Sequence, residues 1–259
     1  MYSPLLNVMT AAAIKAGKGL MRDFGEVDEL HISRKSASNF VTKSDIRTEK
    51  LLQKELTIAR PNFGFLMEES GEVKGKDTSH RWIIDPLDGT SNFIHAIPYF
   101  CISIALEKTY PNGDTEIIAG VIFDPIHNEL FTAEKGKGAL VNNRKLTVST
   151  RENLEESMLV TGSPRNAVST FEAVSKCSAA VRYFGASALD LAYLAAGRID
   201  ACWYHNIKPW DIAASMLLIQ EAGGLLTNLD GTEASIYSPS ILASNRILHQ
   251  SVQKLITPL

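Results

Sequence analysis

Residues 82–93 read Trp-Ile-Ile-Asp-Pro-Leu-Asp-Gly-Thr-Ser-Asn-Phe, a stretch in which an apolar run is followed by two aspartates. Its apolar start predicts the end of a buried strand, which stops at two carboxylates, Asp85 and Asp88. Pro86 fixes the turn between them, and Gly89-Thr90 opens a predicted short helix. We therefore expect both carboxylates to converge on one point at the carboxyl end of a strand.

The segment around this stretch predicts an antiparallel sheet. From residue 81 to about residue 148, short apolar or alternating runs are separated by turn residues that adopt positive φ at low cost. The predicted strands cover residues 82–84, 100–106, 117–123, 130–133 and 139–141. Two amphipathic helices are predicted before it, over residues 3–24 and 45–59, the second closed by Pro61.

Beyond this segment the pattern alternates between helices and strands. Strands are predicted at 158–161 and 201–204, and helices at 170–180, 187–196 and 211–222. Such alternation indicates a second sheet covered by helices. We expect two halves with a large shared interface: residues 1–148 form an α+β half with the antiparallel sheet and most metal ligands, and residues 149–259 form an α/β half that closes the active site.

The composition excludes several classes of protein. The chain has 259 residues, of which 45% are hydrophobic, and 26 Lys and Arg stand against 29 Asp and Glu, so direct binding of nucleic acid is not expected. No stretch reaches the roughly 18 to 20 apolar residues of a membrane-spanning helix. The N-terminus lacks the charged start of a secretory signal, and the three cysteines have no disulfide or zinc spacing. We expect a cytoplasmic protein.

The acidic residues of the chain predict a metal site. Besides Asp85 and Asp88, the sequence offers Glu68-Glu69 upstream and Asp211 at the start of a predicted helix. Carboxylates without histidine or thiol form a hard, oxygen-only ligand set, which selects Mg²⁺ over zinc or copper. Because Mg²⁺ prefers sites shared with phosphate oxygens, such a cluster usually serves phosphoryl chemistry. The exposed N–H groups at Gly89 and Thr90 would add a local anion site.

Each of these residues also has a purely structural interpretation when it is taken alone. Asp211 and Asp45 each adjoin the start of a predicted helix and are each more often an N-cap than a catalytic group. Glu68-Glu69 is most often a solvated pair in a loop, and residues 85–89 can be a simple turn. All of these residues together are stronger evidence for a functional site than any one of them is alone.

Three segments in this order resemble the signatures of the inositol monophosphatase family. They are Glu68-Glu69-Ser70, residues 82–93, and Pro-Trp-Asp-Ile-Ala-Ala at 209–214 followed by Glu-Ala-Gly-Gly at 221–224. The stretch Gly-Ala-Ser-Ala-Leu-Asp-Leu-Ala-Tyr at 185–193 is similar to that of bacterial members of the extragenic-suppressor type. The resemblance covers nearly the whole chain.

The resemblance implies a layered α-β-α-β-α sandwich of the α+β class and Mg²⁺-dependent, lithium-sensitive hydrolysis of a phosphate monoester, with inositol 1-phosphate as the default substrate. It implies two to three Mg²⁺ ions: one held by Glu68, Asp85 and the Leu87 carbonyl, one by Asp85, Asp88 and Asp211, and a weaker one by Glu68 and waters. It implies that Asp45 and Thr90 orient and deprotonate the attacking water. Substrate contacts are assigned by the resemblance to Glu68, Leu87, Asp88, Gly89, Thr90, Arg182, Ser187 and Asp211.

Two positions depart from the family pattern. Met67 stands where the family usually has glycine, and Tyr204 stands where inositol-specific relatives carry a glutamate that binds sugar hydroxyls. Because a phenol cannot replace a carboxylate acceptor in the same geometry, the substrate can differ from inositol 1-phosphate. Arg182 and Ser187 match substrate-side positions but are equally well a surface cation and a helix N-cap.

Two alternatives therefore stay open beside the default. The first is the same chemistry on another small phosphorylated polyol or sugar, a nucleotide 3′-phosphate, a sugar bisphosphate or histidinol phosphate. The second is a protein-binding role, because suppressor-type relatives are linked to RNA polymerase and ribosomal RNA transcription. A homodimer is the expectation at the level of the family.

Overall fold

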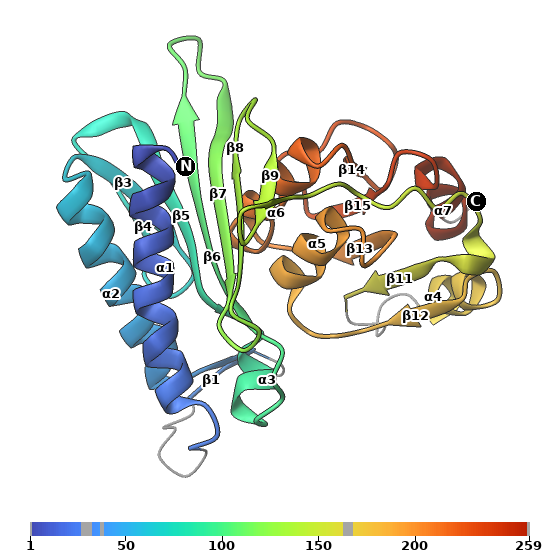
Figure 1. The fold of residues 1–259 in the computed structure, drawn as a ribbon, viewed down its shortest axis with the longest axis horizontal. Coiled ribbons are helices and arrows are strands. Elements are labelled where there is room, and N and C mark those ends of the chain that lie inside the picture. The colour runs from blue at the N-terminus through green and yellow to red at the C-terminus, as the bar shows by residue number, and fades with distance from the viewer. Residues whose placement is uncertain (1, 27–32, 37–38, 163–167, 258–259) are drawn as a thin grey trace.

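The computed structural model describes residues 2–26, 33–36, 39–162 and 168–257. Figure 1 shows five layers: helices α1 (Pro4–Asp23) and α2 (Lys43–Ala59), a large sheet, helices α5 (Ser187–Ala195) and α6 (Pro209–Glu221), a smaller sheet, and helices α4 (Val168–Ser175) and α7 (His249–Ile256). This is the α-β-α-β-α sandwich that the family resemblance implies.

The first layer consists of the two predicted amphipathic helices. α1 spans Pro4–Asp23 after the N-cap Ser3, whose side chain accepts from the backbone N–H of Leu6. α2 spans Lys43–Ala59 and so begins two residues before the predicted start, because Thr42 caps it. Their apolar faces pack on the large sheet, where Met9, Leu20, Leu52 and Leu56 are fully buried.

The large sheet contains the predicted antiparallel run. Its strand order is β10-β9-β8-β7-β6-β5-β3-β4, and all neighbours are antiparallel except β3 and β5. The strands are β3 (Phe63–Met67), β4 (Gly71–Val73), β5 (Asp77–Asp88), β6 (Cys101–Thr109), β7 (Thr115–Asp124), β8 (Glu129–Glu134), β9 (Ala139–Val141) and β10 (Arg144–Lys145). A separate pair is formed by β1 (Ser33–Ser36) and β2 (Asn39–Val41). The short helix α3 spans Thr90–Ile94.

Two helices fill the space between the sheets. α5 spans Ser187–Ala195 and α6 spans Pro209–Glu221, and both are buried on nearly every side. α6 lies directly on β7 at Gly120, where an added Cβ would lie 2.8 Å from the backbone oxygen of Ala214. This close approach fixes how deeply α6, which carries Asp211, sits against the large sheet.

The smaller sheet has the order β12-β11-β13-β15-β14 and mixes parallel and antiparallel pairs. Its strands are β11 (Met158–Thr161), β12 (Ala180–Arg182), β13 (Ala201–His205), β14 (Leu225–Asn228) and β15 (Ser240–Ser244). The 3₁₀ helix η2 (Leu154–Glu156) precedes it, and α4 (Val168–Ser175) and α7 (His249–Ile256) cover its outer face. The predicted helix 170–180 is wrong at its end, because Ala180 already belongs to β12.

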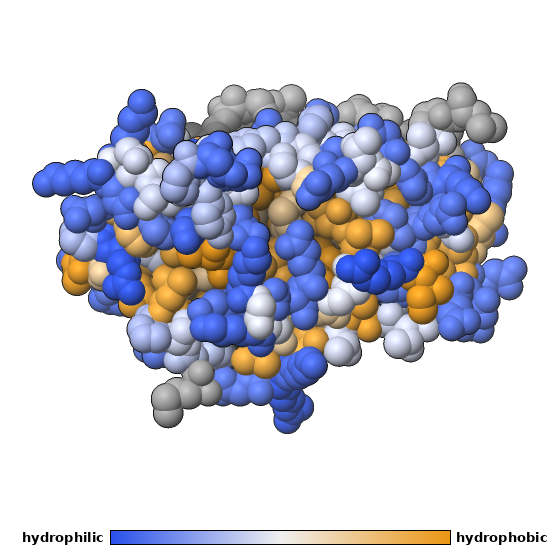
Figure 2. Space-filling model, turned by 90° about the horizontal axis from the view of Figure 1, so that it is seen from above, coloured by the Kyte–Doolittle hydropathy of each residue, from blue (hydrophilic) through white to orange (hydrophobic). Residues whose placement is uncertain are grey.

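The face of the molecule seen in Figure 2 is mostly polar. Figure 2 shows hydrophilic side chains over most of the visible face, with smaller apolar areas between them. None of the helices in the described part of the chain combines the length and the apolar character needed to cross a membrane. Cys101, Cys177 and Cys202 are all free, as their spacing predicts.

Candidate active site

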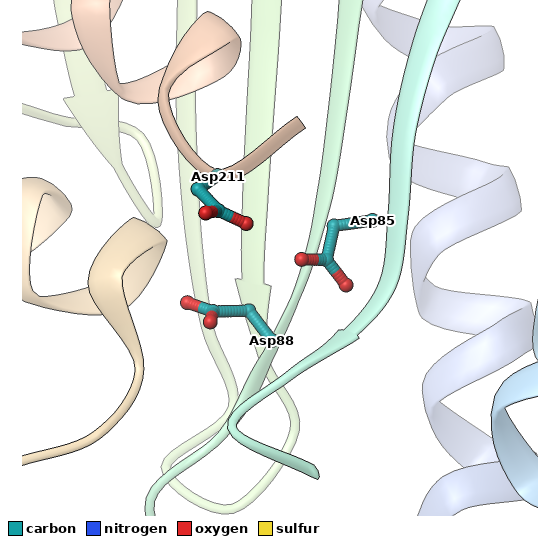
Figure 3. Close-up of side chains that lie close together, drawn as sticks. All are labelled: Asp85, Asp88 and Asp211. Carbon is teal, nitrogen blue, oxygen red and sulfur yellow. The ribbon is translucent and has the colours of Figure 1, made fainter. Parts of the chain in front are cut away.

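Three aspartates from two distant parts of the chain meet between the large sheet and α6. Asp85 and Asp88 lie at the end of β5, and Asp211 lies in the first turn of α6 (Figure 3). One carboxylate oxygen from each lies within 4.8 Å of one from each of the others. The predicted convergence of Asp85 and Asp88 is therefore present, and Asp211 joins them.

The turn after residue 84 aims the first two carboxylates. The pairing of β5 with β6 shifts register between Asp85 and Asp88, which lets both side chains turn to the same side. The backbone N–H of Leu87 donates to Asp85 Oδ1 at 2.9 Å. The backbone N–H of Ala188, at the start of α5, donates to Asp88 Oδ2 at 2.6 Å. Each carboxylate thus receives one backbone hydrogen bond that holds its orientation.

Asp211 is held by its own helix, although not as an N-cap. α6 begins at Pro209, because proline suits the first helical position, and Lys208 is the N-cap residue. Asp211 Oδ2 accepts from the backbone N–H of Lys208 at 3.0 Å, from the third position of the helix. The interpretation of Asp211 as an N-cap, and the predicted helix start at residue 211, are therefore wrong.

The three carboxylates lie in an environment that disfavours their negative charge. Burial, and next to it the charge of Glu68, raises the pKa of Asp85 well above its ordinary value, and burial with the charge of Asp211 does the same for Asp88. Burial also raises the pKa of Asp211 to about 6. Within the described residues no Lys, Arg or His forms an ion pair with any of the three. An oxygen-only cluster of this kind fits a hard divalent cation, which would neutralise the mutual repulsion.

Glu68 follows β3 and lies beside this cluster, but it is not one of the three residues whose oxygens lie within 4.8 Å of one another. Its backbone N–H donates to the carbonyl oxygen of Ile84 at 3.2 Å, which places the residue next to the end of β5. Its charge contributes to the raised pKa values of Asp85 and Asp88. Glu68 and Glu69 are both half-buried, so they are not a fully solvated loop pair.

Asp45 and Thr90 are in contact, as the family resemblance implies. The Thr90 hydroxyl lies 3.1 Å from Asp45 Oδ1 and 3.0 Å from the carbonyl oxygen of Leu87, and it can donate to one of them at a time. Asp45 is fully buried, and its Oδ2 accepts from the backbone N–H of Thr42. Because Thr42 is the N-cap of α2, Asp45 is its capping-box partner at the third position and not the cap itself. Burial raises the pKa of Asp45, opposed by these hydrogen bonds.

Gly89 allows the chain to turn sharply at this point. It has φ of 95° and directly precedes α3, and an added Cβ would lie 2.9 Å from the carbonyl oxygen of Tyr99. Only glycine combines this backbone conformation with such a close approach. The turn places Thr90 at the start of α3, where its hydroxyl reaches Asp45.

A cavity of about 180 Å³ opens beside the aspartates. Asp88, Asp211 and Ser187 are among its lining residues, whereas Arg182 is not. Ser187 is the first residue of α5 and Ala186 is the N-cap, so the N-cap interpretation of Ser187 is wrong. Arg182 is exposed at the end of β12, and its guanidinium donates to the carbonyl oxygen of Val181. The exposed Tyr183 lines the cavity in its place.

Tyr204 and Asp190 form a pair on the cavity wall that the sequence did not predict. Tyr204 is only 5% exposed, and its hydroxyl donates to Asp190 Oδ2 at 2.8 Å. Tyr99 donates to the other oxygen of Asp190 at 2.6 Å. Burial raises the pKa of Asp190 to about 7, although both phenol hydrogen bonds oppose the shift. The only available signal was one aspartate in the otherwise apolar start of the helix 187–195.

The chain matches a known family model over nearly its full length. The model is that of the inositol monophosphatase family, and it covers residues 1–258. An inositol-1-monophosphatase from Caulobacter vibrioides is 49% identical over 253 residues, which are 94% of this chain and 97% of the relative. A protein named Nus factor SuhB from Xylella fastidiosa is 45% identical over 244 residues, which are 90% of this chain and 85% of the relative.

Solved structures of similar proteins have the same fold. The extragenic suppressor protein suhB from Bartonella henselae superposes with a TM-score of 0.94 at 45% identity, covering 98% of this chain and 99% of its own. An IMPase/NADP phosphatase complexed with Mg²⁺ and phosphate superposes with a TM-score of 0.84 at 25% identity, covering 98% and 96%.

Proposed function

This chain belongs to the inositol monophosphatase family, whose members are metal-dependent phosphoric monoester hydrolases. We propose that it hydrolyses a small phosphate monoester with Mg²⁺, and that inositol 1-phosphate is the first candidate substrate. The observation that carries the proposal is the convergence of the buried Asp85 and Asp88 with the half-buried Asp211 beside a cavity. We expect this activity in the cytoplasm.

The proposed metal ligands are Asp85, Asp88 and Asp211, together with Glu68 and the carbonyl oxygen of Leu87. When bound, two to three Mg²⁺ ions would supply the positive charge that acidifies the attacking water and neutralises the phosphate and leaving-group oxygens. The fit rests on this structure, because Asp85 and Asp88 are buried and Asp211 is half-buried. Their charges oppose one another, and none of the three forms an ion pair with a Lys, Arg or His of the described residues. The related structure complexed with Mg²⁺ and phosphate supports the choice of ion.

Asp45 and Thr90 are proposed to handle the proton of the attacking water. The Thr90 hydroxyl donates to Asp45, which leaves its oxygen free to accept a hydrogen bond and orient a water. The buried Asp45 is a stronger base than an ordinary carboxylate, because its pKa is raised, and it can take the proton through Thr90. The N–H groups at Gly89 and Thr90 are proposed to contact the phosphate.

The substrate's alcohol part is proposed to occupy the cavity that Ser187 lines. The acceptor that inositol-specific relatives offer is replaced by Tyr204, whose hydroxyl is already donated to Asp190. Because of this observation, three other compounds remain candidate substrates: a sugar bisphosphate, a nucleotide 3′-phosphate and histidinol phosphate. Arg182 lies outside the lining, so a contact from it requires a substrate that reaches beyond the cavity.

One experiment tests the reaction and the substrate together. Phosphate release is measured from inositol 1-phosphate and from the competing phosphates across a range of Mg²⁺ concentrations, with and without Li⁺. Lithium-sensitive, Mg²⁺-dependent release from inositol 1-phosphate is the expected result. Mg²⁺-dependent release from another ester alone would replace the substrate, and the absence of release from all of them would overturn the proposal.

A second role, as a protein-binding factor of the transcription machinery, is favoured by the relatives named Nus factor SuhB. Such a role would use exposed surface and can coexist with catalysis. Capture of RNA polymerase by both the wild-type protein and an Asp88→Asn variant would support binding that is independent of the metal site. Failure of both proteins to capture it would contradict the role. Size-exclusion chromatography with light scattering tests the expected homodimer.

A further inference from the structure

The first turn of α5 and its hydrogen bonds connect two tyrosines to the cluster of Asp85, Asp88 and Asp211. Tyr99 and Tyr204 donate to the two oxygens of Asp190, at 2.6 and 2.8 Å. Two residues before Asp190, the backbone N–H of Ala188 donates to Asp88 Oδ2 at 2.6 Å. The first turn of α5 therefore carries the Asp190 carboxylate, which the two tyrosines hold, and the Ala188 amide, which holds Asp88 of the cluster.

The turn is also tied to the element that supplies the third aspartate. The Ser215 hydroxyl of α6 donates to the carbonyl oxygen of Ala188 at 3.2 Å, and Asp211 lies one turn earlier on the same helix. Ala188 thus contacts Asp88 through its N–H and α6 through its carbonyl. A displacement of this one residue would change both sides of the cluster.

Tyr204 does not substitute for the family's sugar-binding carboxylate. Its hydroxyl is buried and donates to Asp190, so its proton is not available to a ligand. Its ring packs where Gly162 leaves room, since an added Cβ there would lie 3.1 Å from the ring. The hydroxyl therefore serves the protein's own structure at the edge of the site.

We propose that Tyr204 is a positioning residue for metal binding: by holding Asp190 it fixes the first turn of α5 and keeps the Ala188 amide on Asp88. The inference rests on the proposed function, because it takes Asp88 as a metal ligand. With one oxygen of Asp88 fixed by the amide, the other is oriented for a cation. Tyr99 contributes in the same way from the other side of Asp190.

The test is the metal affinity of Tyr204→Phe, which removes the hydroxyl and keeps the ring. Mn²⁺ takes the same oxygen ligands as Mg²⁺, and its free concentration is measured by electron paramagnetic resonance without substrate. Loss of an outer partner of a metal ligand typically weakens binding 10- to 100-fold, and we expect about 10-fold. Excess Mg²⁺ should restore kcat, while KM for the phosphate ester at saturating metal stays unchanged.

Tyr110→Phe is the matched control. Its hydroxyl also donates to a carboxylate, Glu116 Oε2 at 2.9 Å, but beyond the far end of β6. We expect wild-type Mn²⁺ affinity in this variant and weaker affinity in Tyr99→Phe. The inference is overturned if Tyr204→Phe binds Mn²⁺ within twofold of the wild type, or if both Tyr204→Phe and Tyr110→Phe lose affinity equally.

The same titration separates this inference from the proposed function. A wild-type protein that binds Mn²⁺ but releases no phosphate would contradict the proposed function, and the comparison of variants would still decide the role of Tyr204. A wild-type protein that releases phosphate and a Tyr204→Phe variant with unchanged affinity would contradict the inference alone. A wild-type protein that binds no Mn²⁺ would contradict both.

Discussion

Asp200 is buried, as are Asp85 and Asp88 of the Asp85–Asp88–Asp211 cluster, but the surroundings of these charges differ. Asp200 is 1% exposed and accepts from the Ser149 hydroxyl, from Arg151 at 3.0 Å and from the backbone N–H of Met158 at 2.8 Å. The carboxylates of the cluster each receive one backbone hydrogen bond and lie against one another. The charge of Asp200 is balanced within the chain, whereas the aspartates of the cluster lie together without an ion pair among the described residues, an arrangement that favours a cation from solution.

The largest effect is expected from Asp88→Asn, which removes one charge from the cluster. We expect the loss of a ligand to exceed the effect of losing an outer partner, so activity falls more than about 100-fold. Because repulsion within the cluster decreases, the metal-free variant should unfold at a higher temperature than the metal-free wild type. Phosphate release and thermal unfolding in EDTA measure the two effects. A fully active variant would contradict the assignment of Asp88 as a ligand.

Asp200→Asn is the opposite case and should act on stability. The change removes the charge that Arg151 pairs with, and an amide cannot accept all of the present hydrogen bonds. We expect a loss of about 2 kcal/mol in the free energy of unfolding, measured by urea denaturation. The activity of the folded variant at low temperature should match the wild type, and a large drop in kcat with unchanged stability would show that the two sites do not differ as described.

The pH dependence of the metal-free protein tests the charge of the cluster directly. The pKa of Asp211 is about 6 in the folded protein and 3.8 ordinarily, so the folded state binds more protons than the unfolded state between these values. Asp85 and Asp88 act in the same direction, because their pKa values are also raised. The free energy of unfolding in EDTA should therefore fall as pH rises from 4 through the window, and saturating Mg²⁺ should reduce the fall. The part that comes from Asp190 and Asp45, whose pKa values burial also raises, should remain. An equal fall with and without Mg²⁺ would contradict the metal assignment.

The smallest effect is expected at an exposed carboxylate, in contrast to the buried ones. Glu172 pairs with Lys176 on the surface of α4, and both side chains are largely exposed. Because water and salt screen such a pair, Glu172→Gln should change neither the unfolding temperature nor the phosphatase activity measurably. A clear loss of either would mean that exposure is a poor guide to the role of acidic residues in this protein.

The sequence predicted the elements whose apolar pattern is long or regular. The antiparallel run from β5 to β9, both N-terminal helices, α5 and β13 are present. Asp85 and Asp88 do converge, although β5 runs on to Asp88 and does not end at the predicted residue 84. β3, β12, β14, β15 and α7 were not predicted. β3 contains Gly64 and no alternation, and β12, β14 and β15 are short, so tertiary packing decides these strands. α7 buries Val252 and Ile256 at helical spacing, so its signal was present in the sequence.

One feature of the site could not be predicted because it depends on distant contacts. The bonds of Tyr99 and Tyr204 to Asp190 leave no local pattern, because the tyrosines lie on other elements. Strand and helix periodicity describe each element alone and carry no information about such pairs. The misplaced helix starts near Asp45 and Asp211 are different, because local signals set both: Thr42 caps α2 in a capping box, and Pro209 takes the first position of α6.

The close contact at Gly120 has a consequence for how this protein can change over generations. Any side chain at that position would push α6, and Asp211 with it, away from β5. Gly19 on α1 has open space around it and tolerates replacement in this respect. In a library that varies both positions under selection for activity, Gly19 should drift to many residues. Gly120 should stay glycine, because every other amino acid has a Cβ atom, which would collide with the backbone of α6.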